Sequence, residues 1–240
     1  ATGSEAEAVR GRTWIPLLTF PFLFLGGLAQ AGQDLSISIR PDKPSQGQLF
    51  LVQLKGARPG DRISGSFRGR KLRFFLDEEQ RLRALGAVEL DCPPKASELL
   101  IQIERPEGGP LQRRLAVQVA AGRFDEQELR VKKRYVKPPK RYRDRIAKER
   151  AAMKKIWDRA PTARAWMGNF VWPRKDEITS AFGLRRTFNG KLESRHRGLD
   201  IDGRSGSRVA AMGAGRIVMV SRRYYSGGTV VIDHGLRLFS

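Results

Sequence analysis

The first half of the chain alternates short apolar runs with segments rich in glycine, proline and aspartate. The turn segments include Pro-Gly-Asp at residues 59–61 and Glu-Gly-Gly at residues 107–109. Apolar runs of this length and spacing, without helical periodicity, predict the strands of a small β-sandwich. The expected strands cover residues 49–54, 63–67, 72–76, 99–103 and 115–119. We therefore assign residues 32–122 to an immunoglobulin-like β domain that acts as a spacer or a recognition module.

The second half predicts one helix followed by a further set of strands. Adjacent prolines at 138 and 139 exclude a helix there, whereas residues 141–157 place apolar side chains near helical spacing. These side chains are Tyr142, Ile146, Met153 and Trp157. From residue 170 onward, β-branched and apolar runs lie between glycines, which is typical of strands. The sequence thus predicts an all-β fold in which a basic helical connector, residues 123–168, joins the sandwich to a second β unit at residues 169–240.

The N-terminal residues have the three parts of a secretory signal peptide. Arg10 and Arg12 precede a mostly apolar stretch at residues 14–28, and Ala-Gln-Ala follows at 29–31. This order predicts a signal peptide at residues 1–31, cleaved after Ala31, and an exported protein of the periplasm or cell envelope. A retained membrane anchor is the alternative, which is disfavoured because the run is shorter than the ~20 residues of a span and contains two prolines.

The net charge of the chain indicates a polyanionic partner. There are 46 lysines and arginines against 25 aspartates and glutamates, which gives +21. Fourteen of the basic residues fall in the segment 130–159. For an exported protein, the expected partner is peptidoglycan, with anionic wall polymers or a membrane surface bound through residues 130–159. The favoured role of the predicted helix is structural, with its apolar side chains packed on a neighbouring domain and its charged face in solvent. A solvated surface that only aids solubility is an equal alternative. Nucleic acid is not expected, because few aromatic side chains accompany the charges.

The residue inventory restricts any metal site to imidazole and carboxylate ligands. Cys92 is the only cysteine, and His196 and His234 are the only histidines. His196 and Asp200 are ligand types that zinc accepts, and Gly198 between them leaves room for a metal. In a straight strand these two residues would lie about 13 Å apart, so the chain must bend near Gly198, with Asp200 opening the next strand. A histidine and an aspartate at a turn are also common in hydrogen-bonded structure without any metal.

Four motifs in order carry a family resemblance. They are Ile-Thr-Ser-Ala-Phe-Gly-Leu-Arg-Arg at 178–186, His-Arg-Gly-Leu-Asp-Ile at 196–201, the glycine-rich residues 209–218, and Gly-Thr-Val-Val-Ile-Asp-His-Gly at 228–235. Residues 170–240 resemble the lysostaphin-type (LytM-like) zinc metallopeptidases that cut peptidoglycan cross-links. The resemblance implies that His196 and Asp200 bind zinc and that His234 is structural. Arg186 is a candidate for binding a substrate carboxylate, with an ordinary surface ion pair as the alternative.

The chain departs from this family at its C-terminal end. Family members continue into a catalytic histidine and a later His-x-His pair that supplies the third zinc ligand. The resemblance therefore implies the N-terminal part of a peptidase domain, with no catalytic residue within these 240 residues. The expected function is a peptidoglycan metalloendopeptidase that is incomplete, and inactive, in this chain. The alternative is a non-catalytic wall-binding or hydrolase-activating protein of the same fold.

Overall fold

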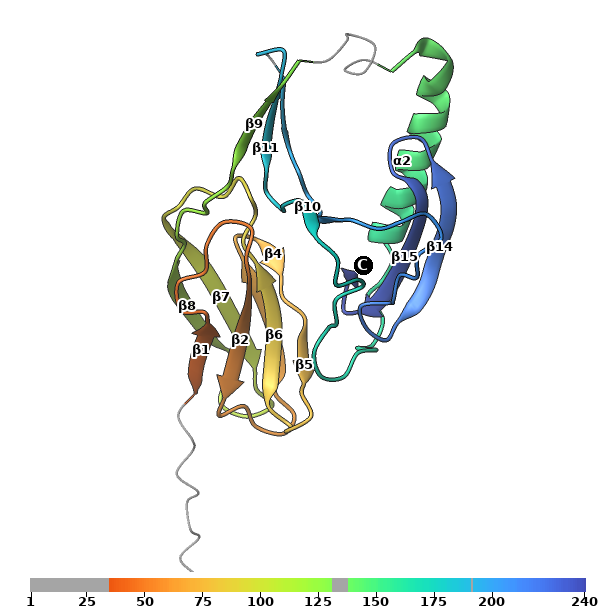
Figure 1. The fold of residues 1–240 in the computed structure, drawn as a ribbon. Helices are drawn as coiled ribbons and strands as arrows, with labels where there is room; N and C mark the ends of the chain where they lie inside the picture. Colours follow the sequence, from red (N-terminus) through yellow and green to blue (C-terminus); the bar gives the residue numbers. More distant parts are fainter. Residues whose placement is uncertain (1–34, 131–137, 191) are drawn as a thin grey trace, which may run out of the picture. The chain divides into compact units, whose positions relative to one another are not determined.

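The computed structural model describes residues 35–130, 138–190 and 192–240, and these residues form mainly β-sheet with one short α-helix (Figure 1). The predicted all-β fold with a helical connector is confirmed. The predicted signal peptide lies outside the described residues. Within the described ranges, no helix has the length and hydropathy needed to cross a membrane.

Residues 36–118 form two antiparallel four-stranded sheets, with strand orders β1-β2-β6-β5 and β4-β3-β7-β8. Their strands are β1 Ser36–Arg40, β2 Leu49–Lys55, β3 Arg62–Phe67, β4 Arg70–Lys71, β5 Phe74–Leu76, β6 Leu82–Ala87, β7 Ala96–Glu104 and β8 Leu111–Gln118. Alternate residues of β2 and β7 are buried and meet in one apolar core, which contains Phe50, Val52, Leu99 and Ile101. This period of two is the pattern of a strand with one face in a core.

The segment 72–76, predicted as one strand, is a strand only at Phe74–Leu76 (β5), and Leu72 and Arg73 connect β4 to β5. β4 belongs to the sheet of β3, whereas β5 pairs with β6 in the other sheet. Leu72 is 8% exposed and inserts into the core at the crossing point. Arg73 follows it, where the chain passes from one sheet to the other.

The predicted helix is present as a 3₁₀ turn, η1 Lys140–Tyr142, followed by α2 Arg143–Trp157. It buries Ile146 and Ile156, whereas the predicted apolar residue Trp157 is 38% exposed. The helix contacts the hairpin of β14 Arg216–Arg223 and β15 Gly227–Gly235. Glu149 accepts a hydrogen bond from the backbone N–H of Tyr224 at 3.0 Å, and Arg145 donates to the Arg222 carbonyl at 3.0 Å.

The remaining strands form three small sheets. They are β9 Glu126–Leu129, β10 Ile178–Ser180, β11 Arg185–Phe188, β12 Leu192–Arg195, β13 Asp200–Ile201 and β16 Leu238–Phe239. β10 pairs with β13, β16 extends the β14–β15 hairpin, and β11 lies between β12 and β9. The β9–β11 pairing is parallel and joins residues that follow the sandwich to the hairpin that precedes His196. The sequence pattern did not predict a strand at β9.

Candidate metal centre

The chain bends between β12 and β13 and brings His196 and Asp200 together. His196 follows the last residue of β12, and Asp200 is the first residue of β13, as the spacing predicted. The His196 Nε2 atom lies 3.3 Å from the Asp200 Oδ1 atom. Two ligand atoms of a tetrahedral zinc ion, each about 2.0–2.1 Å from the metal, are about 3.3–3.4 Å apart. The separation of these two atoms therefore fits a shared zinc ion.

The surroundings of the imidazole determine which nitrogen faces the carboxylate. Nδ1 of His196 lies 2.9 Å from the Ala181 carbonyl oxygen. A carbonyl only accepts hydrogen bonds, so Nδ1 carries the proton of the neutral ring and Nε2 presents a lone pair. Two acceptor atoms then face each other, and a cation bound between them would satisfy both. Their 3.3 Å separation is longer than a charge-assisted hydrogen bond, typically about 2.7–2.9 Å, and is compatible with a shared metal ion.

Ser180 supports the imidazole from behind, and it was not identified as a site residue from the sequence. It is the register partner of Asp200 in the β10–β13 pair and is 8% exposed. Its Oγ lies 3.0 Å from Nδ1 of His196 and accepts a hydrogen bond from Nη2 of Arg186 at 2.9 Å. Partners of this kind fix the orientation and tautomer of a metal-binding histidine. The motif at 178–186 contains Ser180, but only the strand pairing shows its contact with the ring.

Arg186 lies on β11, and its hydrogen bond to Ser180 directs part of its guanidinium toward the imidazole rather than into solvent. Its Nε atom is buried and has no hydrogen-bond partner among the described residues. The arginine thus contacts the residue that supports His196. Its recognition of a substrate carboxylate stays a prediction.

Gly198 leaves the approach to Nε2 open. Its backbone φ lies outside the left-handed region, so the bend itself does not require glycine. A Cβ atom built at this position would have one neighbour within 4 Å, the Nε2 atom of His196, at 3.7 Å. A larger side chain at 198 can therefore cover the nitrogen that would bind a metal.

Hydrogen bonds to residues 183 and 184 fix the backbone of His196, and contacts of the neighbouring Arg195 add to them. The carbonyl of His196 accepts from the N–H of Gly183 at 2.7 Å, and its N–H donates to the Leu184 carbonyl at 2.9 Å. The preceding Arg195 forms an ion pair with Asp91 at 3.4 Å, and its guanidinium lies 5.0 Å from the ring centroid of Phe124. These contacts place the imidazole on a strand end fixed on both sides.

A third ligand is not found in the described part of the chain. There, no three His, Cys, Asp or Glu side chains are grouped so that they can hold a metal ion. His234 is fully buried; its Nδ1 lies 2.7 Å from the Ala214 carbonyl and its Nε2 lies 2.8 Å from Ser240 Oγ. With both ring nitrogens occupied, His234 has the structural surroundings that the resemblance implied.

The donor set and spacing of His196 and Asp200 fit two ligands of a zinc site, and the comparisons place this site on a known fold. No family model matches the sequence, and no curated protein matches it. A crystal structure described as "putative peptidase M23 from Pseudomonas aeruginosa" matches with a TM-score of 0.58 and 20% sequence identity. The match covers 82% of this chain and 72% of that chain. At the level of fold, the chain is therefore similar to the LytM-like (M23) peptidases, as the sequence motifs predicted.

Proposed function

We propose that residues 169–240 form part of the zinc centre of a metalloendopeptidase that hydrolyses peptide cross-links of peptidoglycan. The observation that carries the proposal is the 3.3 Å separation of His196 Nε2 and Asp200 Oδ1, with Nδ1 of the same ring engaged by the Ala181 carbonyl. Zinc at such a centre acts as a Lewis acid on a scissile amide and activates water.

The residues of this chain prepare the centre for that chemistry. The Ala181 carbonyl and Ser180 hold the Nδ1 proton, so Nε2 stays available as a lone pair. The Asp200 side chain is 57% exposed, so a substrate can reach the centre from solvent. No imidazole other than those of His196 and the buried His234 occurs in the sequence. The described residues bring no third His, Cys, Asp or Glu to this pair, so we expect the 240-residue chain by itself to be inactive.

We further propose that the protein is exported and binds a polyanionic surface, which the positive charge of α2 supports. On α2, exposed cations include Arg143, Lys148, Arg150 and Lys155. A cationic helix face concentrates the protein at anionic wall polymers or a membrane surface. This part of the proposal rests on the charge pattern and the predicted signal peptide.

A second candidate function is a non-catalytic wall-binding or hydrolase-activating protein of the same fold. It is favoured by one observation, the lack of a third metal ligand among the residues that the structure describes. The two candidates differ in whether zinc binds at His196 at all, because a binding module does not need the metal.

A zinc titration followed by NMR of the histidine side chains tests the proposal. We expect zinc to shift the ring resonances of His196 and to leave those of the buried His234 unchanged. Asp200→Asn should abolish the response, whereas Asp202→Asn is the matched control, because its carboxylate lies two positions away and accepts a hydrogen bond from the N–H of Gly203. A His196 response that survives in Asp200→Asn contradicts the metal centre.

A peptidoglycan assay separates the two functions. With zinc added, the 240-residue chain should release no soluble fragments from purified peptidoglycan. Release that is lost in His196→Ala would show that the chain itself is active and that our ligand count is wrong. Binding to peptidoglycan that is equal with zinc and with a chelator, combined with no zinc response at His196, would support the non-catalytic function.

A further inference from the structure

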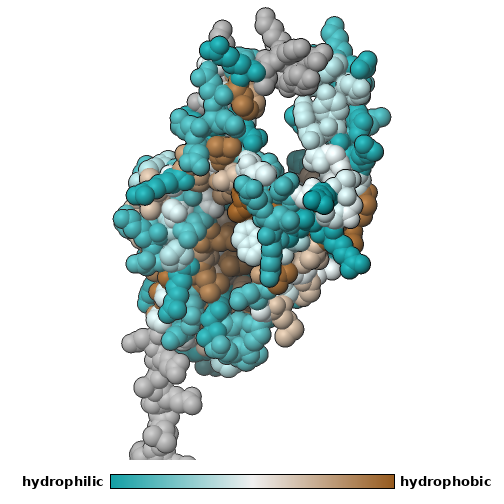
Figure 2. Space-filling model, in the orientation of Figure 1, coloured by the Kyte–Doolittle hydropathy of each residue, from teal (hydrophilic) through white to brown (hydrophobic). Residues whose placement is uncertain are grey.

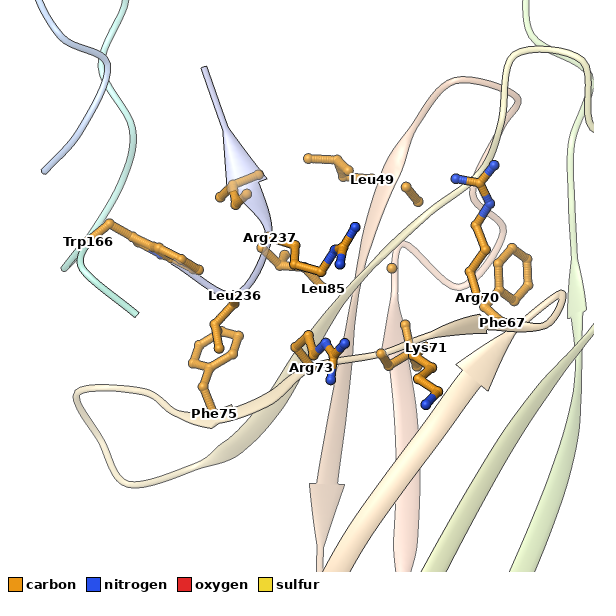
Figure 3. A pocket seen from close by; sticks show the side chains of 14 residues that line it. Leu49, Phe67, Arg70, Lys71, Arg73, Phe75, Leu85, Trp166, Leu236 and Arg237 are labelled. Atoms are coloured by element: carbon orange, nitrogen blue, oxygen red, sulfur yellow. The ribbon is translucent and has the colours of Figure 1, made fainter. Parts of the chain in front are cut away.

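A second candidate site lies away from the residues of the metal centre. A cavity of about 510 Å³ is lined by sandwich residues around β4, β5 and β6 and by residues 166 and 236–238 (Figure 3). None of these residues contributes to the His196 centre. The volume falls within the range of small-molecule sites, roughly 300–1,000 Å³. Figure 2 shows apolar side chains over β5 and β6 with hydrophilic surface around them.

The charged side chains of the cavity lining are all cationic. Four of the lining residues carry a positive charge and none carries a negative one: Arg70, Lys71, Arg73 and Arg237. Arg70 forms an ion pair with Glu89 outside the lining. Arg237 donates to the main-chain carbonyls of Trp157 and Arg159, which leave its charge uncompensated. The cavity therefore has a surplus of positive charge that an anion would neutralise.

Arg73 places a buried donor atom in the lining of the cavity. Its Nε atom is buried and has no hydrogen-bond partner among the described residues. Buried donors are satisfied in the great majority of native structures, so an unpartnered one requires an explanation. A second hollow of about 820 Å³ shares Lys71, Arg73 and Leu236 with the cavity, and its lining also contains no acidic residue. Arg73 therefore lines both hollows.

One end of the cavity is lined by apolar side chains and by a turn with left-handed backbone conformation. The rings of Phe75 and Trp166 lie edge to face with centroids 5.8 Å apart, and Leu236 lies near Phe75 in the view of Figure 3. Leu236 and Arg237 form the two-residue turn between β15 and β16, with φ values of +51° and +66°. Turns of this type favour Asn and Gly, so this chain holds a leucine and an arginine in a strained backbone conformation. Both residues line the cavity.

We propose that this cavity binds an anionic amphiphile, a molecule with a phosphate or carboxylate head and an apolar body. Arg73 and Lys71 contact the head through their charged ends. Phe75, Trp166 and Leu236 cover the apolar body. The strained turn persists because it holds Leu236 and Arg237 at the ligand. This site is independent of the proposed peptidase centre.

Isothermal titration calorimetry with the whole 240-residue chain tests this proposal. The probes are hexyl phosphate and hexanoate, with inorganic phosphate, hexanol and hexyltrimethylammonium as comparisons. We expect at least one of the two anionic amphiphiles to bind about tenfold or more tightly than each comparison compound, and their relative affinities distinguish a phosphate from a carboxylate head. No binding of either amphiphile up to millimolar concentration, or equal binding of the ammonium compound or of inorganic phosphate, would overturn the proposal.

Three variants separate ligand binding from folding. Arg73→Met should weaken binding about tenfold or more while leaving the melting temperature unchanged or raising it, because the variant removes an unpartnered buried donor. Lys71→Gln, at an exposed position, provides the same test if Arg73→Met does not fold. Lys55→Gln removes the same charge from an exposed position outside the cavity and should bind normally. Normal binding by both cavity variants would contradict the proposal. His196→Ala should bind the amphiphile normally, so failure of the peptidase proposal would leave this one standing.

Discussion

Replacing Gly198 by alanine and by leucine tests whether this glycine serves the metal or the fold. The backbone φ at Gly198 is outside the left-handed region, and an added Cβ would contact Nε2 of His196 alone, at 3.7 Å. Folding therefore tolerates a side chain here. Because a non-glycine residue reduces the freedom of the unfolded chain, we expect Gly198→Ala to raise the free energy of unfolding by about 0.4–1 kcal/mol.

The effect on zinc should have the opposite sign and should grow with side-chain size. Alanine adds only the Cβ atom, which is in ordinary contact, so zinc binding should be retained. Leucine adds atoms that extend about 2.5 Å beyond Cβ, enough to cover Nε2. We expect Gly198→Leu to weaken zinc binding at least tenfold, about 1.4 kcal/mol, while its stability stays at or above that of the parent chain.

Two measurements decide the outcome. Urea denaturation gives the free energy of unfolding of the three proteins, and an NMR titration of the His196 ring gives their zinc affinities. Unchanged affinity in Gly198→Leu would show that the metal does not approach Nε2 past residue 198. A loss of more than about 1 kcal/mol of stability in Gly198→Ala would show instead that the fold needs this glycine.

Three further predictions follow from other contacts. Ser180→Ala should weaken zinc binding about tenfold without changing the circular dichroism spectrum, since the imidazole Nδ1 loses one of its two partners, and unchanged affinity would contradict this support role. The backbone N–H of Tyr224 holds the pKa of Glu149 below its usual 4.5, so the carboxylate stabilises the fold above about pH 4.5 and this contribution is lost as the pH falls through the lowered pKa. Glu149→Gln should thus be less stable than the parent in urea at pH 7, with a difference that narrows in acid; a constant difference would exclude the linkage. The double variant Leu236→Asn, Arg237→Gly should raise the free energy of unfolding by about 1–2 kcal/mol, measured by urea denaturation, because it relieves two left-handed residues, and a loss of stability would show that the turn is not strained.

The sandwich core could be predicted because burial leaves a periodic pattern in the sequence. β2 and β7 alternate buried and exposed residues, so their apolar side chains identify them directly. β9 has the sequence Glu-Gln-Glu-Leu and pairs with β11 through backbone groups, so no side-chain pattern reveals it. The pattern predicted a strand that starts at Leu72, whereas β5 starts at Phe74. Leu72 is buried although it lies in the connection between the two sheets, so its apolar side chain resembles the start of the strand.

In the candidate site too, some contacts could be predicted from the sequence and others could not. His196 and Asp200 are close in sequence, so their meeting needed only a local bend, which the spacing indicated. Ser180 lies twenty positions before Asp200 and reaches the imidazole only through the register of β10 with β13. Arg186 reaches the site through Ser180. Such contacts depend on strand pairing, which the sequence pattern of these short polar strands does not specify.

Because β9 pairs in parallel with β11, the segment between these two strands forms a loop that starts and ends in the same sheet. The chain leaves this sheet after Leu129 and returns to it at Arg185, beside the strand it left. The cost of closing such a path grows slowly, by about 0.6 kcal/mol for each doubling of its length, so added length between Leu129 and Arg185 should by itself cost little. A shortened chain that starts after β9 would, in contrast, strip the parallel neighbour from β11. The β-sheet that contains β11 therefore includes a strand from much earlier in the sequence. Truncation experiments on the C-terminal part of the chain should retain residues 126–129.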